Sequence, residues 1–166
     1  MRKLSFFFGG TLFLGFLLTA TAFKPLPKAV TAKKFATSSV NGGGSAIEGG
    51  VKSTFVFNAV SHEDGSTNGH LVYNLRLSGV TIQMDIDCLN ILAGNRATLG
   101  GTVTSVSGDN IPNYIFVGQR ASFTVEDNGN GGSNDKISDL FLGSETSCAD
   151  NWSTYLSIQG NITIRE

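Results

Sequence analysis

Apolar and polar residues alternate with a period of two along most of the chain after residue 53. The alternation is plainest in three runs, whose apolar members are Phe55, Phe57 and Ala59, then Leu71, Tyr73, Leu75 and Leu77, then Val80, Ile82, Met84, Ile86 and Cys88. A period of two is typical of half-buried antiparallel strands, whereas amphipathic helices have a period of 3.6 residues. The three runs therefore predict strands.

Weaker alternations follow in the second half of the chain. Strands are expected over residues 120–126 and 156–165, a shorter one over 136–142, and 113–117 is a candidate for another. Antiparallel strands without helices form a meander barrel or a sandwich. The sequence therefore predicts an all-β, antiparallel fold of seven to eight strands, with both architectures open.

Glycine-containing turns set the expected register. The dipeptide Ser78-Gly79 separates two of the apolar runs, and glycine supplies the positive φ that a two-residue hairpin turn needs. With this turn Leu75 faces Ile82, and inward residues of one strand meet inward residues of the next. A one-residue slip would place them opposite outward residues. The pattern predicts strands over 71–77 and 80–92.

A second turn at Gly94-Asn95 extends this hairpin into a three-stranded meander, with the third strand over residues 96–106. In this register Leu92 faces Ala97, and the inward faces match again. Asn90 is the exception, because it is polar at an inward position and has apolar neighbours on the outward side. We interpret this as a bulge near the end of the long strand.

The N-terminal residues have the order of a secretory signal. Met-Arg-Lys precedes an apolar run from Leu4 to Leu18, and Thr-Ala-Thr-Ala ends in a cleavage site after Ala22. The run is too short to span a bilayer comfortably, since spanning takes about 20 apolar residues. We expect a secreted, periplasmic or cell-surface protein with a signal peptide over residues 1–22, a flexible Lys- and Ser-rich lead-in over 23–40 and an all-β domain over 41–166.

The charge of the expected domain narrows its partners. Residues 35–166 carry six basic and 13 acidic side chains. A nucleic-acid partner would need a basic face, so the composition argues against one. No later segment is apolar enough to cross a membrane as a helix. The expected partner is an extracytoplasmic protein or a glycan.

The chain has two cysteines, Cys88 and Cys148. In an exported protein an even pair predicts a disulfide, with two buried free thiols as the alternative. Neither cysteine has a near neighbour of its kind, which disfavours a zinc site built from cysteine. We therefore expect one disulfide.

The polar loop over residues 126–136 most resembles a functional site. When a calcium loop is numbered from Asp127, a glycine falls at its sixth position and Asp135 at its ninth, but the twelfth is Ser138 instead of glutamate. An EF-hand is excluded, and an improvised calcium site of Asp127, Asn130, Asp135 and backbone carbonyls remains a hypothesis; no other cofactor is expected. The alternatives are a strand-connecting turn, which favours Asn, Asp and Gly, and a loop that contacts a ligand or partner.

Evidence for catalysis is weak. His62 and His70 flank a loop with two carboxylates, which suits either a transition-metal site or the polar end of a hairpin. The sequence has no nucleophile elbow and no zinc-protease motif. We expect no enzymatic activity.

Several short motifs together resemble one family. They are Gly42-Gly43-Gly44, Lys52-x-x-Phe55-x-Phe57, Gly69-His70-Leu71-x-Tyr73, Gly94-Asn95-x-Ala97, Gly100, Val125-x-Asp127-Asn128-Gly129-x-x-Gly132-x-x-Asp135 and Gly160-Asn161-Ile162-x-Ile164. Their order over about residues 40–166 resembles the post-choice-of-anchor (post-COAP) domain of secreted bacterial surface proteins, a family without an established activity. The chain has Asn130-Gly131 where Glu-Pro is common in that family. The resemblance implies a location and a fold and no mechanism.

These observations predict an exported, non-enzymatic accessory or interaction domain. The alternative is a module that binds a small ligand or glycan, in a barrel mouth or on the loops around 126–135 and 144–155, where Trp152 and Tyr155 lie. A polar, unfilled interior would favour the ligand module. A packed interior with an apolar surface patch would favour a protein partner.

Overall fold

The computed structural model describes residues 36–166 except 49, 77 and 130–133, so the expected signal peptide lies outside the described residues. The described part has no helix, and hence none that is long and apolar enough to cross a membrane. Its strands are β1 (Ala36–Glu48), β2 (Val51–His62), β3 (Thr67–Leu75), β4 (Val80–Leu92), β5 (Arg96–Ser107), β6 (Arg120–Glu126), β7 (Lys136–Ile137), β8 (Phe141–Leu142) and β9 (Leu156–Arg165).

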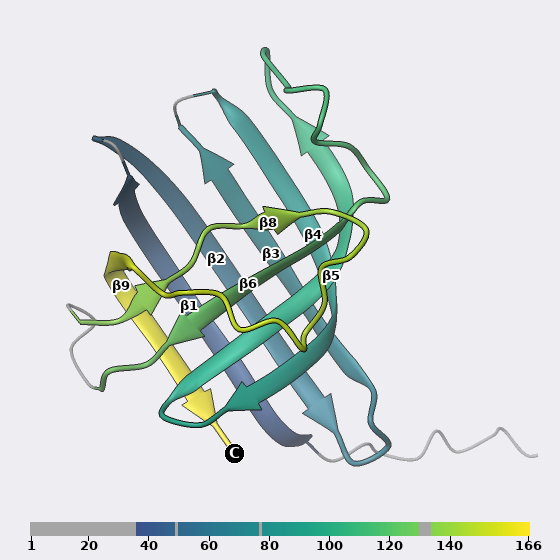
Figure 1. Cartoon of the computed structure of the whole chain (residues 1–166), viewed down its shortest axis with the longest axis vertical. Helices are drawn as coiled ribbons and strands as arrows, with labels where there is room; N and C mark the ends of the chain where they lie inside the picture. Colours follow the sequence, from purple (N-terminus) through teal and green to yellow (C-terminus); the bar gives the residue numbers. More distant parts are fainter. Residues whose placement is uncertain (1–35, 49, 77, 130–133) are drawn as a thin grey trace, which may run out of the picture. The chain divides into compact units, whose positions relative to one another are not determined.

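The strands form one antiparallel sheet that closes on itself (Figure 1). Pairing follows the chain from β1 to β6, passes through β7 to β9, and returns from β9 to β1. β8 pairs with the other end of β6. The expected all-β antiparallel meander is confirmed, and closure of the ring selects the barrel over the sandwich.

Side chains fill the barrel interior. Leu71, Met84 and Phe123 are fully buried, and the rings of Phe57 and Phe123 meet edge to face with 5.3 Å between their centroids. Burial alternates along β2 and β4 as the period-two pattern predicts. Because small barrels are just wide enough for their own side chains, a binding site is to be sought at a barrel end or on the outer surface.

Strand β1 begins at Ala36, so residues 36–40 belong to the sheet, whereas a flexible lead-in was expected there. The glycines of this strand are needed for packing. A Cβ on Gly42 would lie 2.8 Å from the Phe57 ring, and one on Gly44 would lie 2.6 Å from a carbonyl oxygen of β9. The glycine-rich composition that suggested flexibility therefore permits a close approach to an aromatic ring and to a neighbouring backbone.

The connection between β3 and β4 is longer than predicted. Leu75 pairs with Val80 and Tyr73 with Ile82, whereas a two-residue turn would place Leu75 opposite Ile82. The predicted register is therefore wrong by two residues, although Gly79 does have a positive φ, of 66°. A shift of two residues keeps the same side chains on the inward face, so the face assignment holds while the partners change.

The connection between β4 and β5 also differs. Leu92 pairs with Arg96 instead of the predicted Ala97, so this register is wrong by one residue. The intervening loop has three residues, and Gly94 and Asn95 both have a positive φ. The pairing of β4 with β5 also shifts between Ile86 and Cys88. This second irregularity makes the one-residue slip compatible with a buried core.

The predicted bulge in β4 is confirmed, since the register shifts between Ile86 and Cys88. The extra residue inverts the faces of the strand beyond it. Leu89 and Ile91, which the alternation placed outside, pack against the core. Asn90, which it placed inside, donates its side-chain amide to the carbonyl oxygen of Cys148 at 3.0 Å.

A segment over residues 143–155, here called the strap, crosses the outside of the barrel in front of β5 and β6 (Figure 1). The expected disulfide between Cys88 and Cys148 is confirmed, and it fixes the strap to β4 with 6.0 Å between the Cα atoms. Gly100 of β5 lies beneath the bridge, where a Cβ would be 2.8 Å from the Cys88 sulfur. The disulfide therefore requires a residue without a side chain at this point of the wall.

Polar side chains on the outer wall hold the strap by hydrogen bonds. Thr98, Ser122 and Thr124 are fully buried although they point away from the core. The Thr98 hydroxyl donates to the Asp150 carbonyl oxygen at 2.7 Å, and the Trp152 indole N–H donates to the Ser122 hydroxyl at 2.8 Å. Burial of these hydroxyls is tolerated because the strap supplies their partners.

The two remaining predicted strands change form. The strand expected over residues 136–142 is interrupted, with β7 and β8 at its two ends. Residues 113–117 form part of a loop instead of a strand. Both segments lie where the regular pairing of strands in the barrel ends.

Candidate functional site

The polar loop between β6 and β7 is joined to β9 by a buried carboxylate. Asp135 is fully buried; its Oδ1 accepts the backbone N–H of Asn128 at 2.9 Å, and its Oδ2 accepts that of Ile162 at 2.7 Å. β7 pairs with β9 over only two residues, so the later amides of β9 need other acceptors. The Asp135 side chain supplies one of them.

Asp127 makes a second contact of this kind. Its Oδ2 accepts the N–H of Ile164 at 3.1 Å, and its Oδ1 accepts the N–H of Gly129 at 3.0 Å. We call Asp127 and Asp135 with their β9 partners the carboxylate seam. Asn130, the remaining residue of the calcium hypothesis, lies outside the described residues. The two carboxylates thus already accept hydrogen bonds from backbone N–H groups. A cation would have to compete with these N–H groups for the carboxylate oxygens.

Glu126, at the start of the same loop, is surrounded by donors. The Thr154 hydroxyl donates to it at 2.5 Å and the Asn128 amide at 2.8 Å, while nitrogens of Arg96 and Lys136 lie 3.8 and 3.9 Å away. The Thr154 hydrogen bond, with the weaker effects of Asn128 and the two cations, holds the pKa of Glu126 below its ordinary value, although burial acts in the opposite direction. These contacts suit a structural anion and not a proton donor poised near neutral pH.

The histidine loop has the features of a hairpin end. The backbone N–H of His62 donates to the Ser66 carbonyl oxygen at 2.9 Å, and the His70 Nδ1 lies 3.2 Å from the Asp85 carboxylate. Within the described residues, no three His, Cys, Asp or Glu side chains are grouped closely enough to hold a metal ion. The polar hairpin end explains both histidines.

The aromatic residues of the strap differ in exposure. Trp152 is partly buried and stacks on Phe141 with 3.9 Å between the ring centroids. Tyr155 is 51% exposed, and its phenol donates to the Asp139 carboxylate. Trp152 therefore packs on the barrel wall, whereas Tyr155 stays largely exposed beside Asp139.

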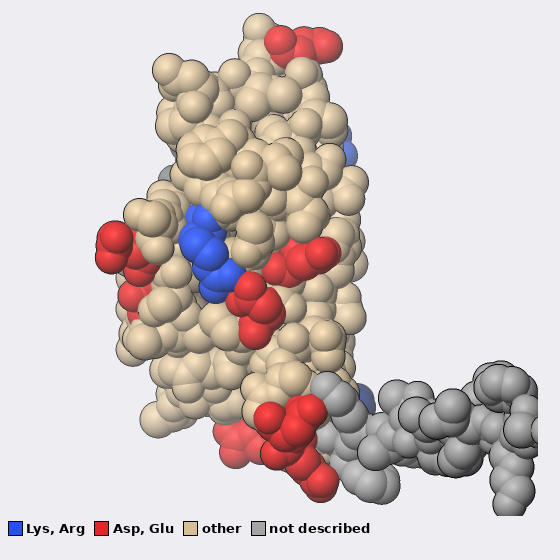
Figure 2. All heavy atoms as spheres, turned by 90° about the vertical axis from the view of Figure 1, so that its right-hand side faces the viewer, with Lys and Arg blue, Asp and Glu red and all other residues tan. Residues whose placement is uncertain are grey.

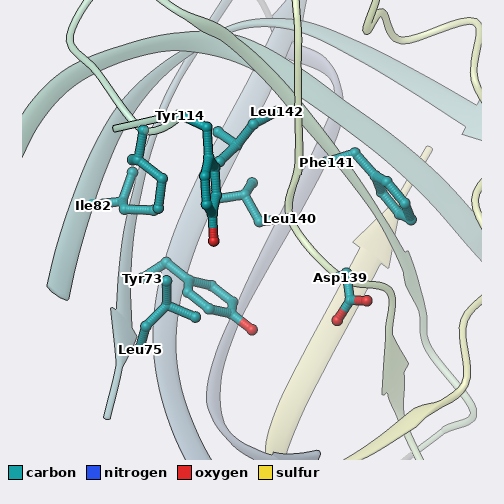
Figure 3. Close-up of a pocket in the computed structure, with 9 residues that line it drawn as sticks. Tyr73, Leu75, Ile82, Tyr114, Asp139, Leu140, Phe141 and Leu142 are labelled. Carbon is teal, nitrogen blue, oxygen red and sulfur yellow. The ribbon is translucent and has the colours of Figure 1, made fainter. Parts of the chain in front are cut away.

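A pocket of about 390 Å³ lies at the end of the barrel where β3 and β4 are connected (Figure 3). In Figure 3 the phenol oxygens of Tyr73 and Tyr114 turn toward its middle, and Asp139 lies at one side. Inner-face residues of β3 and β4, the loop after β5, the irregular stretch before β8 and β8 itself build its walls. The lining residues are Tyr73, Leu75, Ile82, Tyr114, Ile115, Asp139, Leu140, Phe141 and Leu142.

The loop between β5 and β6, residues 108–119, carries a cluster of exposed apolar side chains beside this pocket. We call it the mouth loop. Its apolar residues, with their exposed fractions, are Ile111 at 42%, Tyr114 at 64%, Phe116 at 55% and Val117 at 60%. Sequence analysis missed its role because the same residues also suit a short strand; the useful signal was an apolar run without alternation between two glycines.

Comparisons with known proteins add no relative. No family model matches the sequence, and no curated protein or solved structure matches it. The resemblance to the post-choice-of-anchor domain stays a prediction. Functional inference therefore depends on the geometry of the mouth loop, the pocket and the carboxylate seam.

Proposed function

We propose that the protein is an exported, non-enzymatic interaction domain that contacts an extracytoplasmic protein partner through the mouth loop. The observation that carries the proposal is the packed interior combined with four exposed apolar side chains on one loop. Isolated apolar residues on a surface are ordinary, but a contiguous group of them marks an interaction site. The confirmed disulfide supports an oxidising, extracytoplasmic compartment.

The mouth loop is held in place while its apolar residues point outward. Ile115 is 5% exposed and anchors the loop in the core. The Gly118 N–H donates to the Val103 carbonyl oxygen at 2.8 Å, and the Val103 N–H donates to the Gln119 carbonyl oxygen at 2.9 Å. A loop fixed at its base loses little conformational entropy on binding, which favours recognition by its outward side chains.

The test is binding of the labelled, oxidised protein to cells of its source. The variant Phe116→Ser/Val117→Ser is expected to lose at least tenfold in binding without a lower melting temperature, because both side chains are exposed. Val56→Ser is the matched control, since Val56 is a 57% exposed apolar residue on β2. Equal binding by the wild type and the mouth-loop variant would contradict the proposal.

A ligand-binding module is the second candidate function, and the pocket is the observation that favours it. Its volume of about 390 Å³ falls within the roughly 300–1,000 Å³ of small-molecule sites. Soaking the protein in a mixture of small sugars and apolar fragments, with the tyrosine signals followed by NMR, tests for occupancy. Shifts confined to residues away from the pocket would exclude this function.

A further inference from the structure

We infer that the pocket binds an apolar amine, with its hydrocarbon part between Tyr73 and Tyr114 and its ammonium group at Asp139. The inference rests on the second candidate function, a ligand in the pocket, and specifies the chemistry of that ligand. Three features of the pocket lead to it: its apolar walls, the one charged residue among its described lining residues, and its two tyrosines.

The walls select the apolar part. Leu75, Ile82, Leu140 and Leu142 line the pocket together with Ile115. Burial of hydrocarbon contributes about 25 cal/mol per Å² removed from water, which suits a chain or ring of several carbons. A fully polar ligand such as a small sugar would leave its hydroxyl groups facing these side chains without hydrogen-bond partners.

The charge of the pocket determines the polar group of the ligand. Among the described residues that line the pocket, Asp139 is the only charged one. Its Oδ2 accepts the Tyr155 phenol, while its Oδ1 has no hydrogen-bond partner among the residues that the structure describes. None of the ion pairs between described residues includes Asp139. A partly buried carboxylate with an unused oxygen beside an apolar hollow is suited to an ammonium donor.

The surroundings favour a cation over an anion. The phenol groups of Tyr73 and Tyr114 border the hollow, and a phenol oxygen can accept a hydrogen bond from an ammonium group. No Lys or Arg of the described part of the chain lines the pocket; Arg76, which follows Leu75, is exposed and outside the lining. On the face shown in Figure 2, acidic side chains occur at both ends and basic ones are few. An anionic ligand would therefore meet repulsion from Asp139 at the site.

The test compares three ligands of one shape, hexylamine, hexanol and hexanoate, by calorimetric or NMR titration of the oxidised protein at pH 7. Hexylamine is expected to bind at least tenfold more tightly than hexanol, and hexanoate more weakly than both. Asp139→Asn is expected to remove the preference for hexylamine over hexanol, while Tyr155→Phe, which keeps the carboxylate, preserves it. Tyr114→Ala alters an exposed residue and is expected to weaken all binding without unfolding the protein.

The outcomes separate the inference from the function on which it rests. Equal binding of hexanol and hexylamine, or a preference that survives Asp139→Asn, would overturn the inference while leaving a ligand pocket. Binding of none of the three would overturn both. An acetylated Leu-Lys-Leu amide then distinguishes two sources of the ammonium group. If this peptide competes with hexylamine for the pocket, the natural ligand is a lysine side chain of a partner. If it does not compete, the natural ligand is a free amine.

Discussion

Replacement of Asp135 by alanine is expected to open the carboxylate seam. The change removes the acceptors of the Asn128 and Ile162 amides, at 2.9 and 2.7 Å, from a position that is fully buried. A hydrogen bond to a charged group contributes about 1.5–3 kcal/mol, so loss of the two is expected to lower the free energy of unfolding by about 3–6 kcal/mol. That is a large part of the about 5–15 kcal/mol that stabilises a typical domain. Asp135→Asn keeps one accepting oxygen and is expected to have an intermediate effect.

The assay is urea denaturation of the oxidised protein, with hydrogen exchange at the Ile162 amide. Asp85→Ala is the control, because it removes one negative charge from a side chain that is 70% exposed and bonded only to His70 among the described residues. The control is expected to change the stability by less than about 0.5 kcal/mol. A loss below about 1 kcal/mol in Asp135→Ala, or unchanged exchange at Ile162, would refute the idea that the carboxylate replaces strand pairing.

Further predictions concern the cation, pH and the disulfide. Millimolar calcium and EDTA are expected to give the same melting temperature, because the seam carboxylates bind backbone amides; a rise of several degrees in calcium would support the cation site. The lowered pKa of Glu126 means that its stabilisation is present above the unfolded value, about 4.3, and is lost as the pH falls through the folded value. Urea denaturation from pH 7 to pH 3 is therefore expected to show a smaller loss in Glu126→Gln than in the wild type. Gly100→Ala is expected to destabilise the oxidised protein by about 1–3 kcal/mol through contact with the Cys88 sulfur, and the reduced protein by less, as thermal melts of both forms would show.

The period-two pattern of the sequence predicts the face of the strand on which a residue lies better than it predicts the residue's partner on the neighbouring strand. The alternation in β3 and β4 correctly assigned Tyr73 and Ile82 to the core, because burial depends only on whether a position is odd or even in its strand. It did not determine that these two residues are opposite each other, since a two-residue shift leaves the pattern unchanged. Where a bulge intervened, as before Leu89, even the face changed, and only the misplaced Asn90 indicated this.

The glycines of β1 show a different limit of structure prediction from the sequence. A run of three glycines and small polar residues has low strand propensity, so the sequence predicted a boundary near it. What makes the strand stable is its position between β2 and β9 and the Phe57 ring that packs over Gly42. These contacts join residues far apart in the chain, and a local pattern contains no information about them.

The candidate site was ambiguous for the same reason. Asp, Asn and Gly occur both in turns and in calcium loops, and their role here depends on amides of β9 that lie 27 and 37 residues further along the chain. The pocket likewise joins Tyr73 with Tyr114 and Asp139, which no spacing rule connects. The disulfide was predicted correctly because two cysteines allow only one intramolecular pairing.

The central claim is that the polar loop is a structural seam and that binding takes place at the mouth loop. Its most direct test is site-specific photo-crosslinking in the extracellular fraction of the source, with the photoreactive residue at Phe116 or at Asn134. Both positions are exposed, so both variants are expected to fold. The account predicts a discrete crosslinked partner from position 116 and none from 134. A partner captured from position 134 alone would contradict it.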